Sequence, residues 1–567
     1  MLEQLVKYAG PTKPGFAPKD VRWAIVCDKQ SKFLGVLELG DASLKKNPGR
    51  TFSTCPELDQ NVKQAGGKSD FLVDTAEIVA LYGSKATDEK IKVKHDYFVK
   101  LLQNAGKVMP ELRKLANLLD DSKAMLKIQT RLQDLKVKPN EKVTFKIGDA
   151  FPVESEAWHE WWQEFRKREV AKTSHGNVMR CFVTGNLVKP KEVHPKIKGL
   201  SDVGGRSSGD VLIGFDKDAF RSYGLQQSAN AAVSEEAASA YRAALNDLIK
   251  NYGKRLAGAK VVHWFKEKVP EEDNPLTWLE QGAEAEELIA QDKARKLLDS
   301  IQSGKRPKLA DNHYYALTLS GASGRVMVRD WMEGQFEELV GNVCAWFDDL
   351  SIVHRYGGTL AKSPKFLAVL GATVRELDDL PAPFVSKMWR VAVRGEPIPQ
   401  FALAQTLARV KVDIIQDQPF NHARMGLMKA YHLRKKGNSG GDLKPYLNEE
   451  HPNPAYHCGR LMAVLARLQN AALGDVGAGV VQRYYAAASA TPALVLGRLT
   501  RTSQFHLNKL DPGLSYWFEE KIAGIWGRIE DNLPTTLSLE EQSLFALGYY
   551  QQLADLRTKK SDKQRGG

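Results

Sequence analysis

The character of the chain changes near Gly334, and this change constrains the fold more than any other feature. Before it, short apolar runs typical of strands alternate with helical stretches. After it, strand signals fade, and alanine and leucine recur at helical spacing, as in RLMAVLARL at 460–468. A chain of 567 residues also exceeds one hydrophobic core. We therefore expect an α+β fold, with a mixed α+β N-terminal region and an all-helical C-terminal bundle, divided at 1–150, 151–335 and 336–567.

Two β-hairpins are indicated in the α+β part. Apolar runs at 21–27 and 32–37 flank a short polar link, and strand-like runs at 314–319 and 325–331 flank the small-residue segment SGASG. The other predicted elements of the first 150 residues are helices at 94–105 and 109–119 and a strand at 143–147.

Three tryptophans, Trp158, Trp161 and Trp162, lie in a helical stretch at 155–170. Aromatic rings can stack on nucleic-acid bases, but aromatic residues at helical spacing more often face a core. We expect these side chains to be packed inside the protein.

The stretch 179–249 joins several signals in one unit. Apolar runs at 181–183 and 211–215 predict strands, and the connection between them is polar, glycine-rich and cationic. A helix is expected after Ser234, whose hydroxyl can cap it. Such a unit can hold a phosphate backbone, a small ligand or nothing, so these residues alone leave its ligand open.

Charge and composition favour a soluble protein with a polyanionic partner. The chain carries 81 Lys+Arg against 68 Asp+Glu, a net charge of +13, which makes nucleic acid the favoured partner. The five cysteines are scattered without a CxxC pair, which argues against disulfides and thiolate zinc sites. No apolar run approaches the roughly 18 residues that span a bilayer, and no signal pattern opens the chain, so we expect a cytoplasmic protein without a membrane partner.

Catalytic motifs are weak. The nearest phosphate-loop match, 253–260, has its lysine one place late and no Ser or Thr after it, and no GxSxG or HExxH motif occurs. His95-Asp96 is similar to the HD pair of some metal-dependent phosphohydrolases, but the outlying ligands are not evident. We expect a binding protein with no catalytic residue, metal or cofactor. The alternative is a metal-dependent nuclease that uses His95 and Asp96.

The stretch 179–249 also carries part of a resemblance to a known protein family. The chain resembles the large subunit of type I-C CRISPR surveillance complexes (Cascade), the c-type large subunit, over nearly its full length. In the stretch 179–249 the matching segments are CFVTG at 181–185, HPKIKG at 194–199, DKDAFRSYG at 216–224, NAAVS at 230–234 and YRAALN at 241–246. Elsewhere they are GFAP at 15–18, FLVDTAE at 71–77, GRVMVRDW at 324–331, YHCGRL at 456–461, SATPA at 489–493, QFHLNKL at 504–510 and GYYQQ at 548–552.

The resemblance implies a non-catalytic, antiviral role beside a guide crRNA. Base pairing with the crRNA reads most of the target, while the large subunit reads the short protospacer-adjacent motif (PAM) in duplex DNA. It also implies strand opening into an R-loop, support of the displaced single strand and recruitment of a helicase–nuclease. The other implied partners are the backbone, crRNA 5′-handle and small subunits of Cascade, and the C-terminal helical part resembles the small subunit of related complexes.

The residues that would read a PAM must be sought by their chemistry. Amide and amine donors on a small loop can enter a groove and contact base edges. The densest such segment is QNVKQAGGK at 60–68. We predict base or wedge contacts from Asn61, Gln64 and Lys68, with Lys63 beside them; a solvated turn is the alternative.

Other cations are predicted to contact the DNA backbone, where each lost phosphate contact weakens binding to all sequences alike. They are Lys45, Lys46 and Arg50 in the N-terminal region and Arg483, Arg498, Arg501 and Lys509 in the helical region. The connection within 179–249 adds His194, Lys196, Lys198 and Arg206, which are candidates for contact with nucleic acid or a neighbouring subunit.

Overall fold

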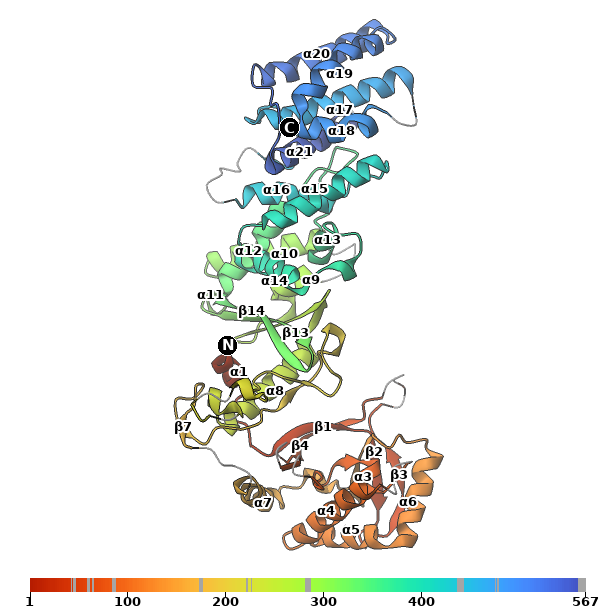
Figure 1. Ribbon diagram of the computed structural model, residues 1–567, viewed down its shortest axis with the longest axis vertical. Coiled ribbons are helices and arrows are strands. Elements are labelled where there is room, and N and C mark those ends of the chain that lie inside the picture. Colours follow the sequence, from red (N-terminus) through yellow and green to blue (C-terminus); the bar gives the residue numbers. More distant parts are fainter. Residues whose placement is uncertain are drawn as a thin grey trace. The chain divides into compact units, whose positions relative to one another are not determined.

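The protein forms two compact units in the computed structural model. The first comprises Met1–Gly199 and Ser207–Asp247, and the second Leu200–Arg206 and Leu248–Gly567. The structure describes residues 1–41, 43, 47–58, 62–63, 66–83, 88–172, 177–220, 223–225, 227–280, 287–435, 443–474, 476 and 479–558. In these residues no strand follows β14 (Arg325–Gln335), and Figure 1 shows only helices beyond it. The predicted α+β region followed by a helical C-terminal region is confirmed.

A four-stranded mixed sheet forms the centre of the first unit. β2 (Trp23–Cys27) is antiparallel to β3 (Phe33–Glu38), as the predicted hairpin requires, and parallel to β6 (Lys142–Ile147). β5 (Asp74–Thr75) pairs antiparallel with the other side of β6. Parallel strands need a long crossover. Between β3 and β6 the chain contributes β4 (Arg50–Pro56), β5 and the helices α3 (Ala76–Val79), α4 (Glu89–Ala105), α5 (Pro110–Asp120) and α6 (Ser122–Asp134).

The tryptophans at 158–162 pack inside the first unit, as predicted. Trp158 and Trp162 are fully buried around Phe71, and Trp161 is half-buried. The Trp162 Nε1–H donates to the Gly15 carbonyl at 2.8 Å, so its one polar group is satisfied. Trp161 and Trp162 belong to α7 (His159–Ala171). The other elements of this part of the chain are α1 (Leu2–Ala9), the antiparallel pair β1 (Phe16–Val21) and β4 (Arg50–Pro56), and η1 (Pro152–Glu154).

The stretch 179–249 differs from its prediction at both expected strands. Its helix, α8 (Glu235–Tyr252), begins as expected, with the Ser234 hydroxyl accepting from the Ala237 N–H at 3.1 Å. The predicted strand at 181–183 is wrong, however, because these residues form a turn that closes at Gly185 with φ +73°. Phe182 is 73% exposed at this turn, so the apolar run did not signal burial.

Only short strands flank that turn. The predicted strand at 211–215 is reduced to a two-residue strand ending at Val211. The elements before α8 are β7 (Met179–Arg180), β8 (Leu187–Val188), β9 (Lys196–Ile197), η2 (Ser201–Val203), β10 (Asp210–Val211), η3 (Asp218–Phe220) and η4 (Gln227–Ala231). The pairs β7–β8 and β9–β10 are both antiparallel.

The second unit begins with antiparallel strands. β11 (Lys254–Leu256), β12 (Ala259–Phe265), β13 (His313–Ala322) and β14 pair in that order. The β13–β14 hairpin confirms the prediction for 314–331. Between β12 and β13 lie η5 (Glu271–Asp273), α9 (Pro275–Glu280), α10 (Glu287–Gln302) and α11 (Pro307–Ala310).

The remaining chain is helical, and its sequence marks several helix starts. Pro454 and Pro492 occupy first-turn positions, and Ser538 with Glu541 forms a capping box. The helices are α12 (Phe336–Leu350), α13 (Phe366–Gly371), η7 (Leu377–Asp379), α14 (Ala382–Arg394), α15 (Gln400–Ile415), α16 (His422–Leu433), α17 (Pro454–Leu473), α18 (Val480–Ala490), α19 (Pro492–Leu507), α20 (Pro512–Ile529) and α21 (Leu539–Arg557). None of the helices in the described ranges is both long and apolar enough to traverse a bilayer.

Helices α17 and α21 cross at unusually close range because each presents a glycine. A Cβ on Gly459 would collide with the Phe545 carbonyl oxygen, and a Cβ on Gly548 would collide with that of Tyr456. The two glycines therefore let the backbones touch. This crossing forms the centre of the C-terminal helices, where Tyr456 and Phe545 are fully buried.

Candidate nucleic-acid interface

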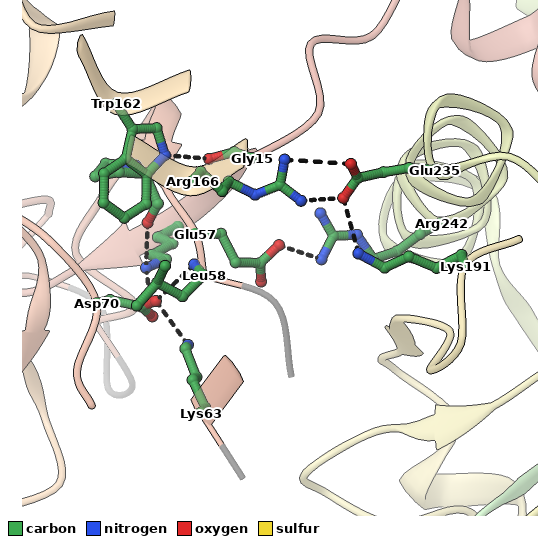
Figure 2. A network of polar contacts seen from close by, with 12 residues as sticks. Gly15, Glu57, Leu58, Lys63, Asp70, Trp162, Arg166, Lys191, Glu235 and Arg242 are labelled. Atoms are coloured by element: carbon green, nitrogen blue, oxygen red, sulfur yellow. Dashed lines mark hydrogen bonds and ion pairs between the residues drawn. The ribbon is translucent and has the colours of Figure 1, made fainter. Parts of the chain in front are cut away.

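The segment predicted to read the PAM is held at both ends by a buried carboxylate. Asp70 accepts from the Lys19 Nζ at 2.8 Å, from the Lys63 Nζ at 2.6 Å and from the Leu58 N–H at 3.1 Å. Lys19, on β1, also donates to the Pro56 carbonyl at 3.0 Å. Figure 2 shows these contacts meeting at Asp70. The loop after β4 is therefore fastened to β1 on one side and to Asp70 on the other.

The charges in this cluster depend on one another. Burial alone would raise the pKa of Asp70, but the charges and hydrogen bonds of Lys19 and Lys63 outweigh it and hold the pKa well below its usual range. Burial likewise opposes the charge of Lys19, and Asp70 and Glu57 raise its pKa in spite of that. Loss of any one partner leaves a charge in a site with little access to water.

A second set of ion pairs ties this region to helices α7 and α8. Arg166 of α7 pairs with Glu235 of α8, and Glu235 also accepts from the Lys191 Nζ at 2.8 Å. Glu57, directly after β4, pairs with Arg242 of α8 at 2.5 Å. Figure 2 shows both pairs beside the Asp70 cluster. These ion pairs connect the residues directly after β4 to α8, and α8 in turn to α7.

The structure describes two of the four predicted PAM residues. Lys63 pairs with Asp70, and the Lys68 Nζ lies 2.5 Å from a carboxylate oxygen of Glu169 on α7. Both lysines keep part of their side chains exposed. Asn61 and Gln64, together with the predicted phosphate contacts Lys45 and Lys46, lie outside the described residues.

Arg50 is the one predicted phosphate contact of the N-terminal region that the structure describes. Its guanidinium pairs with Glu154 at 2.5 Å and lies 4.8 Å from the ring centroid of Phe52 and 4.9 Å from that of Phe151. The side chain is exposed, so its outer edge remains open to solvent. The aromatic pair fixes the direction of this cation on β4.

Of the candidates in the connection of 179–249, His194 is buried. It is 1% exposed, and its Nδ1 lies 2.7 Å from the Tyr241 hydroxyl of α8. Lys196 is half-buried on β9, and Lys198 is exposed, with its N–H donating to Asn246 of α8. Arg206 is exposed and belongs to the second compact unit.

Sequence reasoning did not single out Lys142, at the start of β6. Burial, with the charges of Lys198 and Lys19, lowers its pKa to about 8. Lys142 and Lys198 therefore repel each other, and an anion such as a DNA phosphate would relieve that repulsion. No sequence signal could find this pair, because the two lysines are far apart along the chain and only the fold brings their charges together.

In the helical region, three predicted backbone contacts lie on α19 or just beyond it. Arg498, Arg501 and Lys509 are exposed, as is Arg483 on the preceding helix α18. None of these four side chains forms an ion pair with another residue in the described ranges. Other cations of this bundle are paired: Arg460 with Glu449 at 3.0 Å, and Arg528 with Glu450.

The two residues of the alternative nuclease site, His95 and Asp96, point in different directions. His95 is buried on α4, with its Nδ1 2.8 Å from the Ile78 carbonyl oxygen, while Asp96 is exposed. Adjacent residues of a helix point about 100° apart, which explains the difference. Within the described part of the chain, no three His, Cys, Asp or Glu side chains lie close enough together to share a metal ion.

These features define a class of protein: an α+β region followed by a helical bundle in which several exposed cations form no ion pair within the described ranges. The family of this particular chain follows from comparison with known protein families. The model of the family described as CRISPR-associated protein (Cas_Csd1) matches residues 2–557, and the chain belongs to this family. The resemblance to a Cascade large subunit is thereby confirmed. A search of curated proteins found no match.

Proposed function

We propose that this protein is the non-catalytic large subunit of a type I-C Cascade complex. It binds duplex target DNA, recognises the PAM, promotes strand opening and R-loop formation, supports the displaced strand and recruits the helicase–nuclease. Its partners are the crRNA and the backbone, 5′-handle and small subunits. The observation that carries the proposal is the family match over residues 2–557, which includes both the α+β region and the helical bundle.

The arrangement of the first unit supports the assignment of PAM reading to 60–68. The Asp70 cluster holds the ends of this loop in place, and a protein loop that enters a groove benefits from such preorganisation. Arg50 and the Lys142–Lys198 pair add positive charge in the same unit. In this proposal the loop contacts bases, and the surrounding cations contact phosphates.

The test is binding of the assembled complex to duplex targets whose flanking bases are randomised. Asn61→Ala, Gln64→Ala and Lys68→Ala should each relax the preference at one or more flanking positions, since a good base contact contributes about 1–3 kcal/mol of discrimination. If all three variants keep the wild-type preference, the PAM loop is assigned to the wrong segment.

Lys68 needs its own control because it also pairs with Glu169. Glu169→Gln removes that ion pair while leaving the lysine. A base contact by Lys68 predicts that Lys68→Ala changes the flanking preference and Glu169→Gln does not. Equal effects of the two variants would mean that Lys68 acts only by supporting the loop.

A further inference from the structure

Helix α19 carries an exposed stripe that combines cations with large apolar side chains. We define the α19 stripe as Leu494, Arg498, Arg501 and Phe505, continued by Lys509 beyond the helix end. The spacing of four, three and four residues places the helical members on one face, since each residue turns the helix by about 100°. Leu494 is 76% and Phe505 71% exposed.

The charge of this face is of one sign. The sequence of α19, PALVLGRLTRTSQFHL, contains no acidic residue. Arg498, Arg501 and Lys509 also lack ion pairs within the described ranges, whereas Lys521 on α20 lies 3.7 Å from Glu449. Phe505 follows the two arginines and precedes Lys509. The stripe is therefore a cationic surface with one exposed aromatic ring between its charges.

This combination favours single-stranded nucleic acid over other occupants. A duplex offers phosphates but keeps the faces of its bases stacked inside, whereas a single strand offers both phosphates and free base faces. An apolar protein helix would match Leu494 and Phe505 but would leave the cations between them without partners. From Leu494 to Phe505 the stripe rises about 17 Å along the helix axis, enough for a few nucleotides.

We propose that the α19 stripe is a single-strand binding site in which Phe505 stacks on a nucleobase while Arg498, Arg501 and Lys509 hold the adjoining phosphates. This inference rests on the proposed support of the displaced strand. It adds the side chain, Phe505, that contacts the bases of that strand. Stacking on a phenyl ring requires no particular base, so the site accepts any sequence. That tolerance suits a strand whose sequence differs with every target.

The test compares two 12-mer oligonucleotides with the purified full chain. One carries thymine bases and the other is abasic throughout, so both present the same phosphates. The wild-type protein should bind the base-bearing strand more tightly. Phe505→Leu should lower affinity for that strand about fivefold to hundredfold, the range expected for one stacked base, and leave the abasic strand unchanged. Phe505→Trp should preserve the difference.

Two sets of controls separate the stacking from the electrostatic contacts. Arg498→Gln and Arg501→Gln should weaken binding to both strands equally. Each lost contact should also reduce the slope of log affinity against log salt concentration by about 0.7. Tyr516→Leu is the matched aromatic control. Tyr516 is 69% exposed on α20, but Glu519 and Glu520 follow it at helical spacing on its own face, so this change should have no effect.

The outcomes distinguish the inference from the proposed function. If the arginine variants weaken binding but Phe505→Leu behaves as wild type on both strands, the strand is bound without stacking and the inference is wrong. If neither the arginine variants nor Phe505→Leu alters binding, the displaced strand is not held at α19 at all. If Phe505→Glu instead releases another Cascade subunit while Phe505→Leu is neutral on both strands, the stripe is a protein interface, which also overturns the inference.

Discussion

At the scale of single residues, the loop proposed to read the PAM depends on one buried ion pair. Lys19 and Asp70 have side chains only 8% and 13% exposed, and their atoms lie 2.8 Å apart. Paired charges in such a site contribute little net stability, but a single one left behind is costly. The value of the pair therefore lies in fixing where the chain passes, at Leu58 and Pro56.

Replacing Asp70 tests this dependence. Asp70→Asn leaves the Lys19 ammonium buried without its counter-charge, and we expect the free energy of unfolding of the first unit to fall by roughly 3–5 kcal/mol. Urea denaturation, followed unit by unit through hydrogen exchange, measures the loss. Asp41→Asn is the matched control, because Asp41 is exposed and, among the described residues, its carboxylate contacts Ser43 alone.

A double replacement isolates the cost of the unpaired charge. Lys19→Met combined with Asp70→Leu removes both charges, and most of the stability lost in Asp70→Asn should return. A loss below about 1 kcal/mol in Asp70→Asn would show that Lys19 reaches water or another partner, and would remove the Asp70 cluster as the anchor of the loop.

At the scale of elements, the α17–α21 crossing is set by two glycines rather than by its large side chains. Because Gly459 and Gly548 each face a carbonyl oxygen of the partner helix, the crossing leaves no room for a Cβ at either position. A single methyl group is enough to force the helices apart. Such overpacking typically costs 1–3 kcal/mol.

We therefore expect Gly459→Ala to destabilise the second unit by about 1–3 kcal/mol, despite alanine being the better helix former. Thermal unfolding measures the effect. Gly524→Ala on α20 is the control: a Cβ there meets no atom within 4 Å, and the change should stabilise the helix by up to about 1 kcal/mol. Stabilisation by both variants, or no effect of Gly459→Ala, would contradict the close crossing.

At the scale of the whole molecule, buried neutral histidines predict sensitivity to acid. Burial lowers the pKa of His194, His263, His432 and His457 to about 4. His457 shows why the proton is excluded: its Nδ1 accepts from Arg460 at 3.0 Å, while its Nε2 lies 2.6 Å from the His451 carbonyl oxygen. A second proton, on Nδ1, would point at the positively charged guanidinium of Arg460.

The sign of the pH dependence follows from these depressed values. Above the ordinary pKa of 6.5, both the folded and unfolded chains hold neutral rings, so stability is complete. Below it, the unfolded chain binds protons that the folded chain excludes down to about pH 4, and stability falls through that window. Each histidine contributes about 1.4 kcal/mol per pH unit there.

Urea unfolding at pH 7, 6 and 5 measures this loss. We expect the midpoint to fall mainly below pH 6.5 and to fall more in the second unit, which holds three of the four histidines. His457→Gln should reduce the number of protons taken up on unfolding by about one, so that the free energy of unfolding falls less steeply as the pH is lowered. A midpoint that stays constant between pH 7 and 5 would mean that these rings take up protons in the folded state.

Much of the fold could be predicted because its signals are local. The β2–β3 and β13–β14 hairpins, the cap at Ser234 and the helical C-terminal region all follow from spacing over a few residues. The prediction at 181–183 failed because periodicity reports apolarity and not burial. Phe182 belongs to an apolar run, yet its turn leaves the ring 73% exposed.

Only part of the candidate site could be predicted from the sequence, for a similar reason. Family resemblance and net charge indicate a nucleic-acid partner, and the exposed cations Arg498, Arg501 and Lys509 could be named from the sequence as candidates. Phe505 was missed because an aromatic residue in a helix is usually assigned to the core. Only the packing of α19 shows that this ring lies on the outside.

By itself, the sequence determined the family, the order of an α+β region and a helical bundle, and an excess of positive charge, because each is a property of residue types and local spacing. The tertiary structure decided which charges are used internally and which remain available. Lys63 and Lys68 meet Asp70 and Glu169, while the cations of the α19 stripe meet no carboxylate in the described ranges. Charge pairing depends on distances of a few ångströms between residues remote in sequence, and only folding sets those distances.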